Sequence, residues 1–248
     1  MANRRLFNWS VSISAWMAVG FVPLQNAQAA GAAYQVDTVE ISEAGACKVE
    51  AWHSLAANRD RVAAVSPACS VPFVRPLELS VQGNYSWSAA DGEASTTLTP
   101  KVKINLADSA IGVPGFAISA TTTHDLATNE NTNVAATAIS TLRLSNVVRV
   151  NFNAGWLWDR SADQHYFTYG LGVDWRTPDN VWTLTAEVFG QTGPADMGSL
   201  TRPRFQAGLR WRPIDRWNVD VIYGRNITGE NANWITIATI LRFPPSER

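Results

Sequence analysis

Residues 205–243 alternate apolar and polar side chains in three segments, which are separated by a tight turn and a longer loop. The apolar face of the first segment carries Phe205, Ala207, Leu209 and Trp211. A repeat of two residues indicates β-strands that have one apolar and one polar face. Aromatic residues stand near the ends of the apolar faces. This placement favours a face turned toward lipid over a face buried in a protein core.

The same alternation recurs along most of the chain. It predicts about twelve strands, at 47–55, 60–69, 77–87, 94–106, 116–123, 133–144, 148–158, 166–175, 181–189, 205–211, 217–224 and 235–243. Pro100 falls inside the fourth, where we expect a bulge or a local break in the ladder. An even number of strands, with connections that alternate between compact and longer, predicts an all-β fold: a closed, antiparallel, up-and-down transmembrane β-barrel. Closure also removes the unpaired strand edges that a membrane does not tolerate.

The N-terminus has the pattern of a cleaved signal peptide. Arg4 and Arg5 precede an apolar stretch at 9–24, and small residues follow at Ala27 and Ala29. We expect cleavage after Ala29, with Ala30 or Ala33 as alternatives. The expected organisation is therefore a signal peptide at 1–29, a periplasmic lead-in at 30–46, the barrel at 47–243 and a tail at 244–248. A short extra strand within 31–46 stays open as an alternative to the lead-in.

Composition agrees with a strand-built membrane protein. Charged residues make up 17% of the 248 residues, against about 25% in typical soluble domains. The chain also holds 11 tryptophans. Cleavage would leave 18 basic and 21 acidic residues, a formal net charge of −3. This balance gives no basic surplus for nucleic acid.

Cys47 and Cys69 are the only cysteines of the chain. A hairpin centred near Asn58 or Arg59 places them almost opposite each other on adjacent strands. Directly opposed side chains have Cβ atoms about 4.5–5.5 Å apart, which is near the reach of a disulfide. Since a secreted chain with two cysteines is expected to pair them, the sequence predicts a Cys47–Cys69 disulfide.

The aromatic residues sort into two groups if both chain ends are periplasmic. The group near the outer rim comprises Tyr85, Trp87, Trp156, Trp158, Phe167, Phe205 and Tyr223. The group near the inner rim comprises Phe116, Trp175, Trp182, Trp211, Trp217 and Phe243. Phe167 and Trp175 are eight residues apart in the sequence, or roughly 26 Å along a strand. At a tilt of about 40° they are separated by about 20 Å of height, close to the ~25 Å apolar band of such barrels. The sequence thus predicts two aromatic girdles.

On these residues the chain resembles the Gram-negative outer-membrane β-barrels, including the porin-like small channels. The final strand, 234–243, looks like the aromatic-ended signal recognised by barrel-assembly machinery, although residues 244–248 extend beyond Phe243. The resemblance implies a location in the outer membrane. It also implies contact with membrane lipid and lipopolysaccharide, and insertion by the assembly machinery.

Catalytic patterns are weak in this sequence. His53, His124 and His165 are scattered, and no spacing suggests a metal or cofactor site. A lipid-modifying barrel enzyme needs a histidine beside a serine, but the turn near 128–132 places His124 away from Ser140. We therefore expect neither enzymatic activity nor a cofactor.

The polar strand faces are more informative, because their charges face the lumen. The candidate pore-lining residues are Lys101, Lys103, Arg143, Arg149, Asp174, Glu187, Arg204, Arg210, Asp220 and Arg242. Together with Lys48, Glu50, Glu78 and Asp125, the polar faces hold eight positive and six negative side chains. The sequence favours a narrow channel for small polar or anionic solutes. A non-conducting structural barrel and a barrel enzyme stay open as alternatives.

Overall fold

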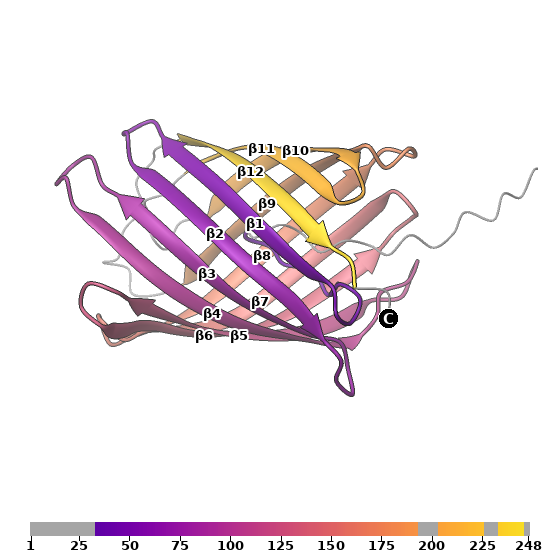
Figure 1. Cartoon of the computed structure of the whole chain (residues 1–248), viewed down its shortest axis with the longest axis horizontal. Coiled ribbons are helices and arrows are strands. Elements are labelled where there is room, and N and C mark those ends of the chain that lie inside the picture. Colours follow the sequence, from indigo (N-terminus) through magenta and orange to yellow (C-terminus); the bar gives the residue numbers. More distant parts are fainter. Residues whose placement is uncertain (1–32, 193–202, 226–232, 246–248) are drawn as a thin grey trace, which may run out of the picture.

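The computed structural model describes residues 33–192, 203–225 and 233–245, which form a single β-barrel (Figure 1). The signal peptide expected at 1–29 lies outside the described residues. The strands are β1 Cys47–Ala56, β2 Arg61–Val71, β3 Leu77–Trp87, β4 Ala94–Ala107, β5 Gly115–Asp125, β6 Glu130–Arg143, β7 Val148–Asp159, β8 Gln164–Arg176, β9 Trp182–Thr192, β10 Arg204–Ile214, β11 Trp217–Arg225 and β12 Asn233–Phe243. No helix in these ranges is long and apolar enough to cross a membrane.

Each strand pairs in antiparallel fashion with its neighbours in the chain, and β1 pairs with β12 to close the barrel. The seam runs from Cys47 opposite Phe243 to Ala56 opposite Trp234. The prediction of a closed, twelve-stranded, antiparallel barrel is confirmed.

The alternation of residues decides which side of the wall each side chain occupies. In β12, Ile235 and Ile237 are 54% and 61% exposed on the outside, whereas Thr236 between them is 3% exposed on the inside. The apolar face therefore points outward and the polar face fills the interior, as a barrel in lipid requires. Pro100 pairs with Val81 on β3 without a register shift. On the β5 side the ladder passes from the Leu98–His124 pair to the Lys101–Thr121 pair, so the local break expected at Pro100 is present there, while the register shift lies between Asn105 and Ala107.

The two ends of the barrel differ in their connections. We call the end where β1 begins and β12 ends the terminal end, and the other the distal end. At the terminal end, Trp211 stacks on Trp182 with ring centroids 6.2 Å apart, and Trp217 lies at the same distance from Trp211. At the distal end, Tyr85, Trp156 and Phe167 are exposed on the outer wall. Their role as lipid girdles stays a prediction.

Cys47 and Cys69 pair directly across the β1–β2 hairpin and form a disulfide. The predicted register and the predicted bond are both present. Because Cys47 is also the first residue of β1, the bond fastens the point at which the preceding residues join the wall.

Candidate functional site

The lumen is occupied by the chain's own N-terminal residues. Residues 33–40, which we call the lumen segment, run inside the barrel from its distal half to its terminal end. Tyr34, Val36 and Val39 are all buried, Val36 to 1% exposure. The sequence pattern indicated a periplasmic lead-in or a short extra strand for this stretch. Its seat inside the barrel is a feature that sequence reasoning missed.

Wall side chains bind the backbone of the lumen segment along its length. Glu187 on β9 accepts hydrogen bonds from the amides of Gln35 and Val36, at 2.9 and 3.3 Å. Asn153 on β7 accepts from the Asp37 amide at 2.7 Å and donates to the Asp37 carbonyl at 2.9 Å. Buried backbone groups need such partners, and here the polar face of the barrel supplies them in place of a neighbouring strand.

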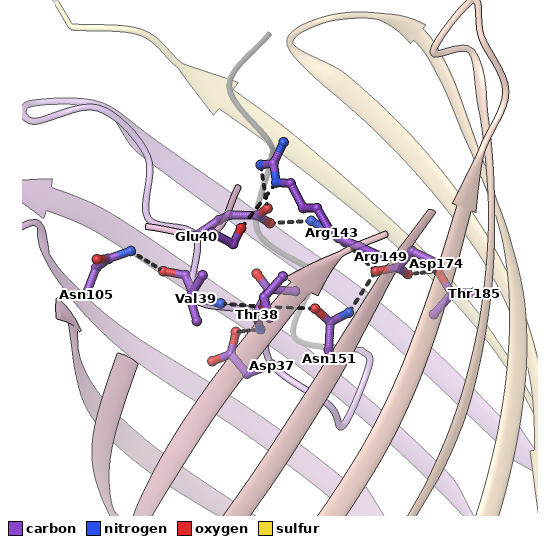
Figure 2. Close-up of polar contacts among 12 residues, drawn as sticks. Asp37, Thr38, Val39, Glu40, Asn105, Arg143, Arg149, Asn151, Asp174 and Thr185 are labelled. Atoms are coloured by element: carbon purple, nitrogen blue, oxygen red, sulfur yellow. Dashed lines mark hydrogen bonds and ion pairs between the residues drawn. The ribbon is translucent and has the colours of Figure 1, made fainter. Parts of the chain in front are cut away.

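Closer to the terminal end, the same kind of recognition continues. Asn105 on β4 donates to the Val39 carbonyl at 2.9 Å, as Figure 2 shows. Thr141 on β6 accepts from the Val39 amide at 3.1 Å. At the distal side, Gln206 on β10 donates to the Ala33 carbonyl at 3.4 Å.

Asp37 binds two lysines of β4. Its carboxylate lies 2.6 Å from the ammonium of Lys101 and 3.0 Å from that of Lys103. Lys103 is only 1% exposed and also donates to the Thr38 carbonyl at 3.0 Å. A buried ammonium requires a partner, so Lys103 depends on the lumen segment for its counter-charge.

Glu40 forms the second ionic contact, and Figure 2 places it next to Arg143 and Arg149. Its carboxylate lies 3.0 Å from Arg143 and is bonded to Arg149. Arg149 in turn donates to Asp174 at 2.5 Å. One arginine thus bridges an acid of the segment and an acid of the wall.

Glycines of the inner wall make room for the lumen segment. A Cβ placed on Gly170 would lie 2.8 Å from a methyl group of Val36, and one on Gly208 would lie 2.2 Å from the Tyr34 hydroxyl. Glycine within a strand marks a close approach of another group. The inward-facing glycines at 170, 172 and 208 were therefore the signal in the sequence that could have located the segment.

The interior differs between the two ends. Toward the distal end Val36 packs with Ala56, Phe189 and Trp234 in an apolar cluster. At the terminal end a cavity of about 890 Å³ is lined by the stretch from Val39 to Ala44 and by Arg143 and Arg242, among others. Val39 and Glu40, the last residues of the lumen segment, form part of the lining of this cavity.

The candidate pore-lining residues all lie on the strands at inward positions, and the structure divides them. Those in ion pairs are Lys101, Lys103, Arg143, Arg149, Asp174, Arg210 and Asp220. Glu187 binds the segment's backbone. Within the described residues, Arg204 and Arg242 have no carboxylate within 4 Å. Whether any of these residues lines a conducting path stays a prediction.

The structure keeps His124 and Ser140 apart. His124 lies opposite Asn131, whereas Ser140 lies opposite Phe116. His165 stacks between the rings of Trp156 and Trp158 at the distal rim. The described ranges contain no group of three or more acidic, histidine or cysteine residues suited to a metal ion.

The fold is that of the outer-membrane porin barrels, which confirms the resemblance at the level of fold. The chain superposes on the KdgM porin in complex with disordered oligogalacturonate with a TM-score of 0.59 and 12% identity, over 79% of this chain and 99% of that one. For the COG4313 outer membrane channel from Pseudomonas putida F1 the values are 0.57 and 12%, over 83% and 98%. For the NanC porin they are 0.58 and 9%, over 79% and 98%.

At the level of sequence, the chain belongs to the family described as uncharacterised conserved protein UCP029691, whose model matches residues 18–243. No curated protein matches it.

Proposed function

We propose that this protein is an outer-membrane channel for small polar or anionic solutes, in which the lumen segment controls the path. The single observation that carries the proposal is how the lumen is filled. Its occupant is a short peptide held by hydrogen bonds and ion pairs, not a close-packed apolar core. The porin fold shared with the KdgM, NanC and COG4313 proteins supports a channel as the general class.

The polar contacts that hold the lumen segment matter because water can replace them. An intramolecular hydrogen bond contributes only about 0.5–1.5 kcal/mol net, since water takes over when the bond breaks. Displacing the lumen segment would expose Lys101, Asn153 and Glu187 to water in a polar channel. Two small apolar clusters would lose contacts, one of Val36 with Ala56, Phe189 and Trp234, and one of Val39 with Ala117 and Ile139. The proposed open state therefore has a wetted lumen with the same wall.

The occupied lumen also favours a second candidate, a non-conducting structural barrel. In that case the lumen segment is a permanent filling and conductance is never seen. The two candidates differ only in whether the segment can leave its seat.

Planar-bilayer conductance of the refolded mature protein tests the proposal, with a variant that lacks residues 33–40 as the comparison. We expect infrequent openings from the wild type and steady conductance from the deletion. Barrel integrity is checked by the different gel mobilities of unheated and boiled samples. A deletion variant that is intact on the gel and silent in the bilayer would establish the structural barrel instead.

Localisation and partners follow from the same proposal. The terminal end faces the periplasm, the outer wall contacts lipid and lipopolysaccharide, and the β12 segment ending at Phe243 is the signal for the barrel-assembly machinery. Envelope fractionation tests the location. Mature protein recovered from the soluble periplasm would contradict it.

A further inference from the structure

Several buried nitrogen donors near the terminal end lack an acceptor. They are Nε of Arg176 on β8, Nε of Arg212 on β10 and Nδ2 of Asn218 on β11. Asn218 is fully buried, and Arg212 is 9% exposed. All three atoms are N–H donors, so the group that would satisfy them is an oxygen acceptor.

Strand register brings these residues into one sector of the wall. Thr183 on β9 pairs with Arg176 on one side and with Arg210 on the other. Arg212 is the next inward-facing residue of β10 toward the terminal end. Neighbouring strands are about 4.8 Å apart, and β8 and β10 are separated by one strand. The backbones of Arg176 and Arg212 are therefore roughly two strand spacings apart around the wall.

Arg242 completes the sector from β12. Its guanidinium donates to Oδ1 of Asn218 at 3.0 Å, which leaves the amide nitrogen of Asn218 as the unused half of that side chain. Arg242 is the member of the sector that lines the terminal cavity of about 890 Å³, so its guanidinium group is the side of the sector reached from that end.

The arginines of this sector form no direct ion pair within the part of the chain that the structure describes. Among the described residues, no carboxylate lies within 4 Å of Arg176, Arg212 or Arg242. The inward arginines on either side are paired, Arg149 with Asp174 at 2.5 Å and Arg210 with Asp220 at 2.7 Å. Arg212 repels both Arg176 and Arg242 electrostatically. Acids that form no ion pair with these arginines attract them in part, namely Glu40 and Asp174 for Arg176, Asp215 for Arg212, and Glu50 and Asp220 for Arg242. A guanidinium as buried as Arg212 is normally paired.

We propose that Arg176, Arg212, Asn218 and Arg242 form a binding site for an oxyanion, a carboxylate or phosphate group of a small solute that enters through the terminal cavity. Guanidinium groups bind both kinds of oxyanion through short, charge-assisted hydrogen bonds. Water could fill the empty donor positions, but unlike an oxyanion it supplies no negative charge to guanidinium groups that form no ion pair with the described residues. This site rests on the proposed function, because it names the class of solute that the channel would take. The experiment that tests the site measures only binding, not conductance.

The thermal unfolding midpoint of the refolded, full-length mature barrel in detergent measures this binding. Inorganic phosphate or succinate replaces chloride at constant ionic strength. We expect a saturable rise in the midpoint, because a ligand bound only to the native state stabilises it. The Arg212→Gln variant should raise the apparent Kd at least tenfold, which corresponds to about 1.4 kcal/mol.

The control is Arg204→Gln, which removes an arginine of the same strand that also has an unpartnered Nε but lies at the distal end. It should leave the phosphate effect unchanged. Arg212→Gln should itself fold, since it relieves repulsion, and its midpoint in chloride should be no lower than that of the wild type. Arg212→Lys, which keeps the charge but lacks the guanidinium fork, is the second variant and should also weaken binding.

A response to phosphate alone or to succinate alone supports the site and identifies the preferred group. The proposal is overturned if neither anion gives a saturable shift, or if the shift is the same in Arg212→Gln. A barrel that binds phosphate but never conducts would leave the site standing while the channel function fails.

Discussion

Val36 lies so close to Gly170 that a Cβ on the glycine would be 3.7 Å from the Cβ of Val36. This spacing is near the mean of about 3.8 Å between Cβ atoms in disulfides. The pair therefore offers a covalent lock between the lumen segment and the wall.

We predict that Val36→Cys combined with Gly170→Cys forms a disulfide under oxidising conditions and abolishes conductance. Peptide mapping verifies the new pairing beside Cys47–Cys69. Adding a reductant should restore openings. The wild type treated with the same reductant controls for loss of the native bond. Full conductance in the verified, oxidised double variant would show that solutes pass without movement of the segment.

Adding side-chain volume to the inner wall should have the opposite effect. Gly208→Val places its Cβ only 2.2 Å from the Tyr34 hydroxyl, so the Tyr34 side chain of the lumen segment has to move. We expect a higher open probability in single-channel recordings. Gly83→Val is the matched control, because its new Cβ meets its nearest neighbour at an ordinary 3.7 Å. Equal behaviour of the two variants would argue against a clash-driven opening.

Asp37→Asn should both destabilise the closed lumen and increase conductance. The substitution leaves Lys103, which is 1% exposed, without its carboxylate. Removing one partner of a buried ion pair costs about 3–5 kcal/mol, and opening the lumen to water recovers part of it. Chemical denaturation and bilayer recordings measure the two effects. Asp91→Asn, at an exposed turn, should change neither.

The Cys47–Cys69 disulfide should be complete in protein isolated from native envelopes, as mass spectrometry of non-reduced peptides can show. The two residues are separated by 22 positions, and closing a loop of that size stabilises the native state by about 3 kcal/mol. A Cys47→Ser/Cys69→Ser variant should lose about that amount in denaturant titrations. Two free thiols in native material would contradict the pairing.

Charge-reversal substitutions should have different effects on arginines that form ion pairs and on arginines that do not. Arg210→Glu places a carboxylate beside buried Asp220, so we expect lower stability more than altered selectivity. Arg242→Glu, which breaks no ion pair among the described residues, should reduce anion preference in reversal potentials under a salt gradient. The preference of the wild type should fade near 1 M salt, where the Debye length is about 3 Å. Unchanged selectivity in the Arg242 variant would place that residue outside the path.

Much of the fold could be predicted because apolar and polar residues that alternate with a period of two indicate a β-strand from the sequence alone. The strand expected at 77–87 is Leu77–Trp87 in the structure, and the disulfide register is the predicted one. The errors lie at strand ends, as in β5, which begins at Gly115 and ends at Asp125. Hydrogen bonding to a neighbour extends these strands past the point where alternation stops.

The lumen segment could not be located in the same way. Its alternation of Tyr34 and Val36 with Gln35 and Asp37 is too short to identify an element, and its backbone bonds go to side chains of several strands instead of to one adjacent strand. Its position depends on tertiary contacts such as Asp37 with Lys103 and Val36 with Gly170. The sequence shows which charged residues face inward. Their division into paired and unpaired groups depends on Asp37 and Glu40, and the sequence does not show that these two residues lie inside the barrel.

The lumen segment connects strands on opposite sides of the barrel. Lys103 on β4 holds Thr38, and Gln206 on β10 holds Ala33. These two strands are six positions apart in a ring of twelve, and so face each other across it. The peptide therefore acts as a cross-brace that resists flattening of the circular cross-section of the barrel. The hydrogen bonds between adjacent strands resist such flattening poorly. A barrel without the brace should be softer across this diameter while its strand pairing stays intact.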